Sequence, residues 1–284
     1  MSQLKFGTCS WKYDSWQGII YSDAARQNYL EEYARHFNTV EIDQWFWSLF
    51  PGKNPAMPRG DTVHEYVTSV PENFKFSVKV PNSITLTHYY HRGNTGPLIE
   101  NPNFLSQSLF ELFLDSVVPM REKLGPLIFQ FEYLNKQKMP SQAVFLDRIV
   151  KFVSGLPPGF SYFIETRNPN YLDEKYFKTI GDLNLRLVFL QGYYMPDIFG
   201  IYQKYEQYIK DAVVIRLHGP DRQGMEKQTN GVWNKIVAPK DHELQALAQM
   251  LRTLDERNVD AYINVNNHYE GCAPLTIQRL KALL

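Results

Sequence analysis

The stretch Ala212–His218 reads AVVIRLH, four apolar residues followed by polar side chains at every second position. The stretch Ala261–Asn267, AYINVNN, has a similar form near the end of the chain. Both are short and rich in residues that favour strands. Because side chains two residues apart lie on the same face of a strand, each stretch predicts a strand with polar side chains on one face at its carboxyl end.

Six further short runs precede these two: Leu4–Cys9, Thr39–Asp43, Phe74–Val80, Leu127–Glu132, Ser161–Arg167 and Leu185–Gln191. Helical patterns lie between them, and eight such βα units close a parallel barrel. We therefore predict one (β/α)8 TIM-type barrel domain over residues 1–284, with eight parallel strands. A doubly wound open sheet is the competing architecture, but no Gly-rich phosphate motif follows any predicted strand.

The predicted helices come from caps and apolar periodicity. Thr62 and Glu65 have capping-box spacing, and the helical stretch 103–124 is expected to split near Pro119 and to stop at Gly125. Other helices are expected to begin at the following residues: Ser22, Ser141, Asp173, Asp197 and Pro274. The long loops 11–21, 81–102 and 220–239 all follow strands, so a barrel places them at its carboxyl face, where lids and sites form.

Composition limits the functional classes. The 284 residues are 44% hydrophobic and 21% charged, which excludes a disordered chain. Thirty Lys and Arg balance thirty Asp and Glu, and this argues against a protein that depends on non-specific attraction to nucleic acid or membranes. The two cysteines cannot form a disulfide framework or a four-cysteine zinc site. With no signal-peptide pattern or membrane-length apolar run, we expect a cytoplasmic protein without a membrane partner; its oligomeric state stays open.

Polar side chains gather at the carboxyl ends of the predicted strands. Most form pairs spaced by two: Glu41 and Asp43, Ser77 and Lys79, Gln130 and Glu132, Glu165 and Arg167, Arg216 and His218, Asn264 and Asn266, with Gln191 ending the sixth strand. Buried charge is costly unless it is paired or lines a cavity. A closed ion-pair network, such as Glu41 with Lys79 or Glu165 with Arg167, is one interpretation. The number of strands involved favours the other, a ligand-sized mouth.

The cations of this mouth predict an anionic ligand. Gly219 allows close backbone approach after the seventh strand, and the run Asn264–Gly271 leads into a helix N-terminus, which favours an anion. The first hypothesis is therefore an enzyme of hydrolase or lyase type that acts on a small anionic or phosphorylated substrate. Its catalytic candidates are Glu41, Lys79, Glu165 and His218. Its ligand-binding candidates are Trp11, Tyr13, Gln130, Arg167, Gln191, Arg216, Asn264, Asn266 and Asn267.

Two roles stay open for the catalytic candidates. The glutamates or His218 can move protons. Lys79 can form a Schiff base, or it can simply neutralise an anion. No cofactor is expected. A divalent metal is not excluded, although cations nearby would repel it; its oxygen and nitrogen ligands would be Glu41, Asp43, Glu165, His218 and His268.

Aromatic side chains follow several strands and can stack on a ring or pack the loops. They are Trp11, Tyr13, Trp16, Trp45, Phe46, Trp47, Tyr89, Tyr90, Tyr193 and Tyr194, with a polar and basic patch at 88–92. These residues keep two alternative functions open. One is a nucleic-acid-binding or phosphodiester-cleaving barrel resembling endonuclease IV, and the other is a non-catalytic ligand-binding barrel.

Several short motifs resemble, in order, those of the domain-of-unknown-function-72 family, the YecE-like proteins. They are Gly7–Tyr13 with Trp16 and Gly18, Tyr33-Ala34, Phe37–Ile42, Phe74–Lys79, Leu124–Leu127 with Gln130, Glu165 with Arg167, Arg216–Gly219, and Asn266-Asn267 with Ala273-Pro274. The resemblance implies a (β/α)8 barrel and no established reaction. The family has been likened to endonuclease-IV-like and sugar-isomerase-like barrels, which implies nucleic acid as an alternative ligand. The metal-binding residues of those enzymes are not recognisable here.

The chain departs from the family pattern at three places. Asp43–Trp47 replaces an Asn and a Thr-Phe-Tyr run, Asn168–Tyr171 follows Arg167 where the family has His and a later Ser-Trp, and Gln191 stands where Asp is common. All three lie at the predicted mouth. A ligand of other family members therefore need not be the ligand of this chain.

Overall fold

Eight parallel strands form the centre of the molecule, in a computed structural model that describes residues 2–22, 28–90 and 97–284. The strands pair in the order β1-β8-β7-β6-β5-β4-β3-β2, a nearly closed barrel. Their bounds are β1 Leu4–Thr8, β2 Thr39–Ile42, β3 Lys75–Lys79, β4 Leu124–Phe131, β5 Ser161–Thr166, β6 Arg186–Gly192, β7 Ala212–Gly219 and β8 Asp260–Val265. The predicted (β/α)8 fold is confirmed.

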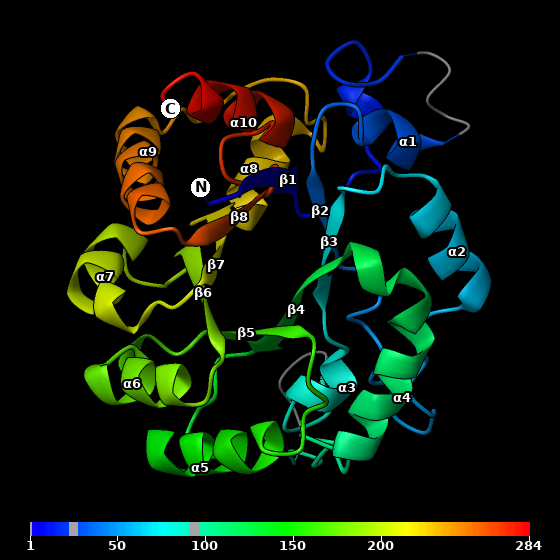
Figure 1. Cartoon of the computed structure of the whole chain (residues 1–284), viewed down its shortest axis with the longest axis vertical. Helices are drawn as coiled ribbons and strands as arrows, with labels where there is room; N and C mark the ends of the chain where they lie inside the picture. The colour runs from blue at the N-terminus through cyan, green and yellow to red at the C-terminus, as the bar shows by residue number, and fades with distance from the viewer. Residues whose placement is uncertain (1, 23–27, 91–96) are drawn as a thin grey trace.

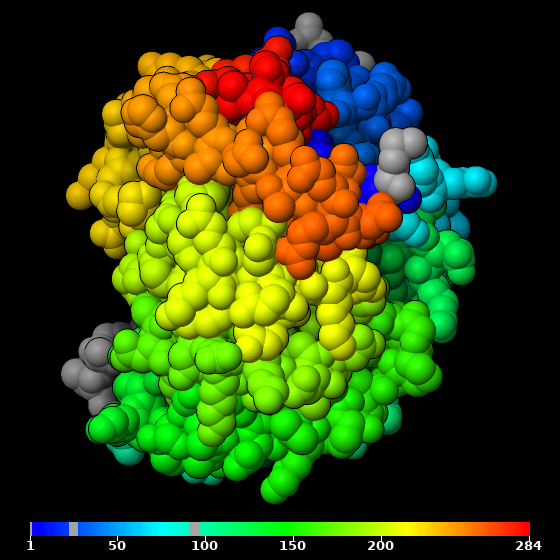
Figure 2. Space-filling view, turned by 60° about the vertical axis from the view of Figure 1, so that its left-hand side comes forward, coloured from blue at the N-terminus to red at the C-terminus, as the bar shows by residue number. Residues whose placement is uncertain are grey.

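Helices surround the strands (Figure 1). Their bounds are α1 Tyr29–Tyr33, α2 Gly60–Thr68, α3 Asn82–Thr85, α4 Gln107–Val117, α5 Gln142–Val153, α6 Glu174–Asp182, α7 Ile198–Tyr205, α8 Arg222–Thr229, α9 Asp241–Glu256 and α10 Ala273–Lys281. Short 3₁₀ turns lie at Asp14–Trp16, Val118–Lys123, Pro169–Tyr171 and Glu206–Tyr208. Figure 2 shows the outer layer following chain order, with C-terminal residues beside N-terminal ones. No helix in the described ranges is both long and apolar enough to cross a bilayer.

Several helix boundaries differ from the sequence predictions. Ser22 does not cap α1; the Asn28 side chain does, by accepting from Glu31 N, while Ser22 donates to Glu32. The predicted capping box of Thr62 and Glu65 is also wrong, because α2 begins at Gly60 and neither of these two residues caps it. Gly125 does not stop a helix, since β4 already begins at Leu124.

Other boundaries are confirmed. The side chains of Ser141, Asp173 and Asp197 each accept a hydrogen bond from a backbone N–H in the first turn of α5, α6 and α7. The stretch 103–124 does divide near Pro119, into α4 and a 3₁₀ turn. The segment 220–239, predicted as a loop, contains α8, whose N-cap is Asp221.

The seam between β1 and β2 is closed by side chains. The Tyr33 hydroxyl accepts from Thr8 N at 2.8 Å and donates to Thr39 O at 3.0 Å, so it bridges the two strands. Gly7 is required here, because a Cβ at this position would overlap the main-chain oxygen of Thr39. Motif residues at the start of the chain therefore complete the barrel.

The barrel interior is apolar below and polar above. A lower set of side chains, Ile128, Phe163, Val188, Val214 and Tyr262, packs into a separate hydrophobic cluster. On β4, β5, β7 and β8 the inward side chains become polar two positions further along, where Gln130 pairs in register with Glu165 and Arg216 with Asn264. On β6 the residue at this level is the apolar Leu190. The apolar cluster closes the floor, and the polar layer lies between it and the carboxyl end of the barrel.

Candidate functional site

A cavity of about 460 Å³ opens at the carboxyl end of the barrel. The residues around it come from the strand ends and the loops that follow them. They are Cys9, Ser10, Trp11, Tyr13, Glu41, Asp43, Gln44, Phe46, Trp47, Lys79, Leu86, Tyr90, Gln130, Glu132, Arg167, Tyr193, Arg216, His218, Arg222, Asn266 and His268. The polar groups of separate strands therefore meet around one opening, as the spacing predicts.

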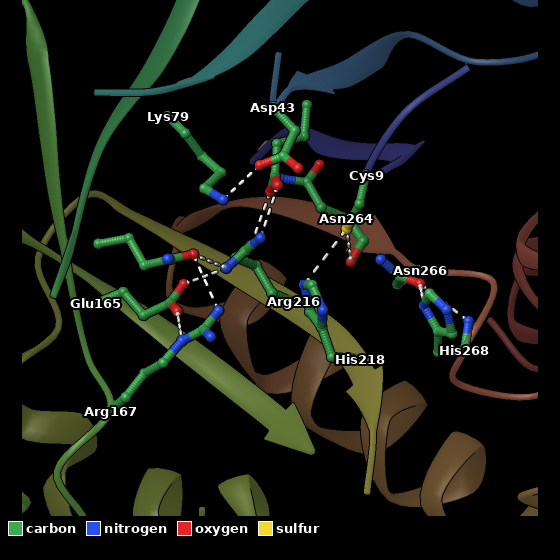
Figure 3. A network of polar contacts seen from close by, with 12 residues as sticks. Cys9, Asp43, Lys79, Glu165, Arg167, Arg216, His218, Asn264, Asn266 and His268 are labelled. Atoms are coloured by element: carbon green, nitrogen blue, oxygen red, sulfur yellow. Dashed lines mark hydrogen bonds and ion pairs between the residues drawn. The ribbon is translucent and has the colours of Figure 1, made fainter. Parts of the chain in front are cut away.

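Arg216 is the centre of the polar layer at the bottom of this cavity (Figure 3). Its guanidinium binds the Glu41 carboxylate through two hydrogen bonds of 2.7 Å. The Nη1 atom also donates to Glu165 at 2.5 Å and to Gln130 at 3.1 Å. The Arg216 side chain is 1% exposed, so most of its donors are already used by the protein. Arg216 therefore holds the site together more than it offers a free contact to a ligand.

The two carboxylates on Arg216 differ in their protonation behaviour. Burial raises the pKa of Glu41 above its usual range, although Arg216 opposes the effect. Burial acts the same way on Glu165, but the Arg216 and Arg167 guanidiniums together hold the pKa of Glu165 below its usual range. Glu165 is therefore the firmly ionised member of the pair.

Lys79 projects into the cavity from β3. Its ammonium group pairs with Asp43 and lies 3.8 Å from the centre of the Phe46 ring. The expected pairing of Glu41 with Lys79 is thus wrong, because Arg216 takes Glu41 and leaves Lys79 to Asp43. Asp43 lies in the stretch Asp43–Trp47, where the sequence is expected to differ from the family pattern.

Arg167 lies between the buried network and the opening. Its Nε donates to Glu165 at 3.1 Å and its Nη2 to Gln130 at 3.0 Å. The predicted Glu165–Arg167 pair is therefore present. The guanidinium carbon lies 4.9 Å from the centre of the Tyr193 ring, and 23% of the side chain stays exposed. These two bonds use two of its five N–H groups, so Arg167 keeps donors for a ligand.

His218 faces the cavity between a thiol and a phenol. Its Nε2 is 3.6 Å from Cys9 Sγ, and its Nδ1 is 3.1 Å from the Tyr193 hydroxyl. Burial, followed by the charges of Arg216, Arg167 and Lys79, holds the pKa of His218 well below its usual range. The imidazole is therefore neutral near pH 7 and able to accept a proton.

Only some of the predicted aromatic residues reach the cavity. Trp11, Tyr13, Phe46, Trp47, Tyr90 and Tyr193 line it. Trp45 instead stacks on Tyr66, and Tyr194 packs edge-on against Tyr133. In the patch 88–92, His88 is buried against Thr87, while residues 91 and 92 lie outside the described residues.

Three predicted ligand-binding residues lie outside the cavity. Gln191 points toward the helices, where its amide donates to Glu243 at 2.9 Å and accepts from Ile198 N. Asn267 accepts from Ala273 N at 2.9 Å at the start of α10. A third, Asn264, is fully buried below the mouth, with its amide 3.3 Å from Glu41. Gly219 allows close approach of the backbone at His268 rather than of a ligand.

Cys9 and Arg222 were not predicted as ligand contacts and His268 was considered only as a metal ligand, yet all three line the cavity. Cys9 follows directly after β1, so its place at a strand end was the available signal, although Gly7 two positions earlier gives no polar pair. Arg222 comes from α8, which lay inside a predicted loop, and it pairs with Glu226 at 2.8 Å.

The carboxylates suggested as metal ligands are held by cations in this structure. Glu41 and Glu165 bind Arg216, and Asp43 binds Lys79. Across residues 2–22, 28–90 and 97–284, no group of three or more His, Cys, Asp and Glu side chains is arranged to hold a metal ion.

The sequence model of the family described as "Protein of unknown function DUF72" matches residues 5–284. The chain belongs to the DUF72 family. The UPF0759 protein YunF of Bacillus subtilis is 24% identical over 263 residues, which cover 88% of this chain and 84% of that protein. The UPF0759 protein YecE of Escherichia coli K12 is 24% identical over 169 residues, 59% of this chain and 50% of that one.

Solved structures of DUF72 proteins share the barrel. A DUF72 protein of Thermotoga maritima superposes with a TM-score of 0.69 at 18% identity, covering 99% of this chain and 98% of that one. A DUF72 protein of Enterococcus faecalis gives a TM-score of 0.66 at 21% identity, covering 99% and 96%. Within this DUF72 chain the motif residues divide into two groups: Gly7, Tyr33 and Thr39 close the seam, and Glu165 and Arg216 build the mouth.

Proposed function

We propose that this DUF72 protein binds a small anionic molecule in the mouth cavity and turns it over by proton transfer. The observation that supports the proposal is the cavity of about 460 Å³, into which β3 and β5 bring the cations Lys79 and Arg167. Each is held in place by protein partners and keeps further N–H donors. Such preorganised cations favour carboxylate or phosphate groups.

In this proposal His218 is the proton carrier. Its imidazole is neutral, its Nε2 faces the cavity beside Cys9, and its Nδ1 is fixed by Tyr193. Glu41 and Glu165 instead hold Arg216, because each accepts charge-assisted hydrogen bonds from it and both are fully buried. Trp11 and Tyr13 line the opening and can pack against the apolar part of the ligand.

Isothermal titration calorimetry with inorganic phosphate, succinate and glycerol tests the proposal. We expect the two anions to bind and neutral glycerol to give no heat. Arg167→Gln and Lys79→Met should each weaken anion binding by about tenfold or more, since each removes a charge-assisted hydrogen bond. Arg59→Gln is the matched control, because Arg59 forms an exposed pair with Asp61 on α2. Anion binding that survives both cavity variants, or no anion binding at all, would contradict the proposal.

The outer edge of the mouth cavity, where Glu132 and Arg222 lie, gives less support to nucleic acid as the ligand. Its cations are matched by nearby carboxylates, as in the pairs Lys138–Glu132 and Arg222–Glu226. We therefore expect gel-shift assays with duplex and single-stranded DNA to show no complex that weakens steeply with rising salt. A complex with that salt dependence, lost in Arg167→Gln, would favour the nucleic-acid function over the small anion.

A further inference from the structure

We propose that Cys9 is a nucleophile that forms a thioester with the acyl group of a small anionic ester or thioester. In this reaction His218 takes the thiol proton, and Tyr193 positions the imidazole. The inference rests on the proposed function for the charge of the ligand and for its place in the cavity. It adds the class of substrate and the covalent step.

The geometry brings the three groups together from separate strands. Cys9 follows β1, His218 lies on β7, and Tyr193 follows β6. Cys9 Sγ is 3.6 Å from His218 Nε2, and the Tyr193 hydroxyl is 3.1 Å from His218 Nδ1 (Figure 3 shows the first contact). All three residues line the mouth cavity that also holds Lys79 and Arg167. A nucleophile, its base and an orienting group therefore face the same space as the anion-binding cations.

At rest the Cys9 thiol and the His218 imidazole are both neutral, so the proton leaves sulfur only as the bond from Sγ to the acyl carbon forms. Burial, with Glu41 nearby, raises the pKa of the Cys9 thiol well above its usual range, so sulfur keeps its proton at rest. His218 is neutral and can receive that proton at Nε2. With Nε2 as acceptor, Nδ1 carries a hydrogen and donates it to the Tyr193 hydroxyl oxygen. The thiol also lies 3.6 Å from the main-chain oxygen of Asn264, which gives its proton a second resting partner.

The reaction balances with the groups in the cavity and water. The thiol proton moves to His218 Nε2 as Sγ bonds to the acyl carbon. The bond from that carbon to the leaving oxygen or sulfur then breaks, and the leaving group takes the proton from His218. Water, deprotonated by His218, attacks the thioester, releases the acid and restores the thiol. No oxidant, reductant or metal is consumed in these steps.

Cys272 is a natural control for this chemistry. It precedes α10 as the N-cap residue, its side chain makes no capping hydrogen bond, and it is fully buried outside the mouth cavity. Ser is a favoured N-cap residue, so Cys272→Ser should keep the fold and leave Cys9 as the remaining thiol. Cys9→Ser changes one atom and is the matched replacement at the mouth.

The test uses the mono-p-nitrophenyl ester of succinic acid, which is anionic, and p-nitrophenyl acetate, which is neutral. Stopped-flow absorbance follows p-nitrophenolate release, and mass spectrometry of tryptic peptides locates the acyl group. We expect a burst of release and an adduct on the peptide Phe6–Lys12, which carries Cys9. Cys272→Ser should keep both, and Cys9→Ser should lose both. His218→Gln should slow acylation by about a hundredfold, the usual scale for a lost general base.

Tyr193→Phe separates a positioning role from a merely structural one. It should slow acylation less than His218→Gln and shift the pH at which the acylation rate reaches half its maximum. An adduct only on Cys272, no adduct on Cys9, or an unchanged rate in His218→Gln would overturn the inference. If phosphate and succinate still bind in those cases, the proposed function survives. If Cys9 reacts equally with both esters and Arg167→Gln changes neither rate, the covalent step stands and the anion preference fails.

Discussion

Arg216 is the residue on which the electrostatics of the mouth depend. It is a buried cation that binds two buried carboxylates, and a second cation, Arg167, shares Glu165 with it. Removing water from these groups is costly, and their mutual hydrogen bonds offset that cost only while all of them are present. The network therefore fixes the positions of Arg167 and Gln130 more than it adds to global stability.

Replacing this arginine should destabilise the fold. Arg216→Met leaves Glu41 and Glu165 buried without their shared cation, so we expect a loss of about 3–5 kcal/mol in the free energy of unfolding. Urea denaturation measures it. Arg222→Met removes an exposed pair with Glu226 and should cost less than about 1 kcal/mol. Equal losses in the two variants would argue against a cooperative buried network.

The neutral state of His218 predicts a pH dependence of stability. Its pKa is lowered in the folded protein, so below the unfolded value of about 6.5 the unfolded chain binds a proton that the native state does not. Native stability should therefore fall as the pH drops from about 8 to about 5, and it should fall less in His218→Gln. The titratable and charged groups around position 218 are the same in both proteins: Arg216, Arg167, Lys79, His268, Cys9 and Tyr193.

Urea unfolding of both proteins across this range measures the difference. His268 also has a lowered pKa, because of burial, and contributes in the same direction to wild type and variant. The comparison between the two proteins therefore isolates His218. Parallel curves over the whole range would show that His218 titrates alike in the folded and unfolded states.

At the scale of single residues the sequence predicts the mouth well wherever polar positions come in pairs spaced by two. Gln191 is an exception, because the residue two positions earlier is the apolar Phe189. Val188 points into the barrel, so the even-numbered residues of β6 face inward and Gln191 faces the helices. Asn267 follows an inward Asn266 directly and so faces the other way. The pairing of Lys79 with Asp43 depends on which carboxylate Arg216 takes, and only three-dimensional packing decides that.

At the scale of elements, the β1–β2 seam depends on one hydroxyl. Tyr33→Phe removes the group that bridges Thr8 N and Thr39 O, so two buried backbone groups lose a partner. We expect a loss of about 1–3 kcal/mol in unfolding free energy, with faster hydrogen exchange at Thr8 N. Tyr90→Phe is the matched control, since Tyr90 is 68% exposed. Unchanged exchange at Thr8 would mean that the seam does not need this bridge.

Two adjacent asparagines between β8 and α10 have different roles. Asn267 accepts from Ala273 N, whereas Asn266 lines the cavity. Asn267→Ala should lower stability by about 0.5–2 kcal/mol and leave phosphate binding unchanged. Asn266→Ala should weaken phosphate binding. Thermal unfolding measures the stability of the two variants, and calorimetry measures their phosphate binding. Weaker phosphate binding in Asn267→Ala would show that Asn267 does contribute to the ligand site.

Helix starts were predictable where the cap acts locally. Ser141, Asp173 and Asp197 each satisfy a backbone N–H within their own first turn, so sequence alone carries the signal. Ser22 has the same residue type, but its hydroxyl and N–H bind the Glu32 carboxylate instead. A tertiary contact thus overrides the local preference, and the sequence around Ser22 does not reveal it.

At the scale of the whole molecule, the eight-stranded barrel brings polar residues from the ends of strands far apart in sequence to one opening. The apolar cluster around Phe163 lies below the polar layer, and the cavity opens above that layer at the carboxyl end of the barrel. Strand count and strand-end polarity predict this architecture because both follow from chain-local periodicity. The identity of the ligand depends on the shape of the opening and on loops such as Asp43–Trp47, which the periodicity does not determine.

A crystal soaked in sodium tungstate shows whether an anion enters the mouth cavity, because tungstate resembles phosphate and its anomalous scattering locates it. We predict a peak inside the mouth cavity within hydrogen-bonding reach of Lys79 and Arg167. The same peak should be absent from crystals of Arg167→Gln. Tungstate bound only on the outer surface, or an opening filled by packed side chains, would contradict an anion-binding mouth.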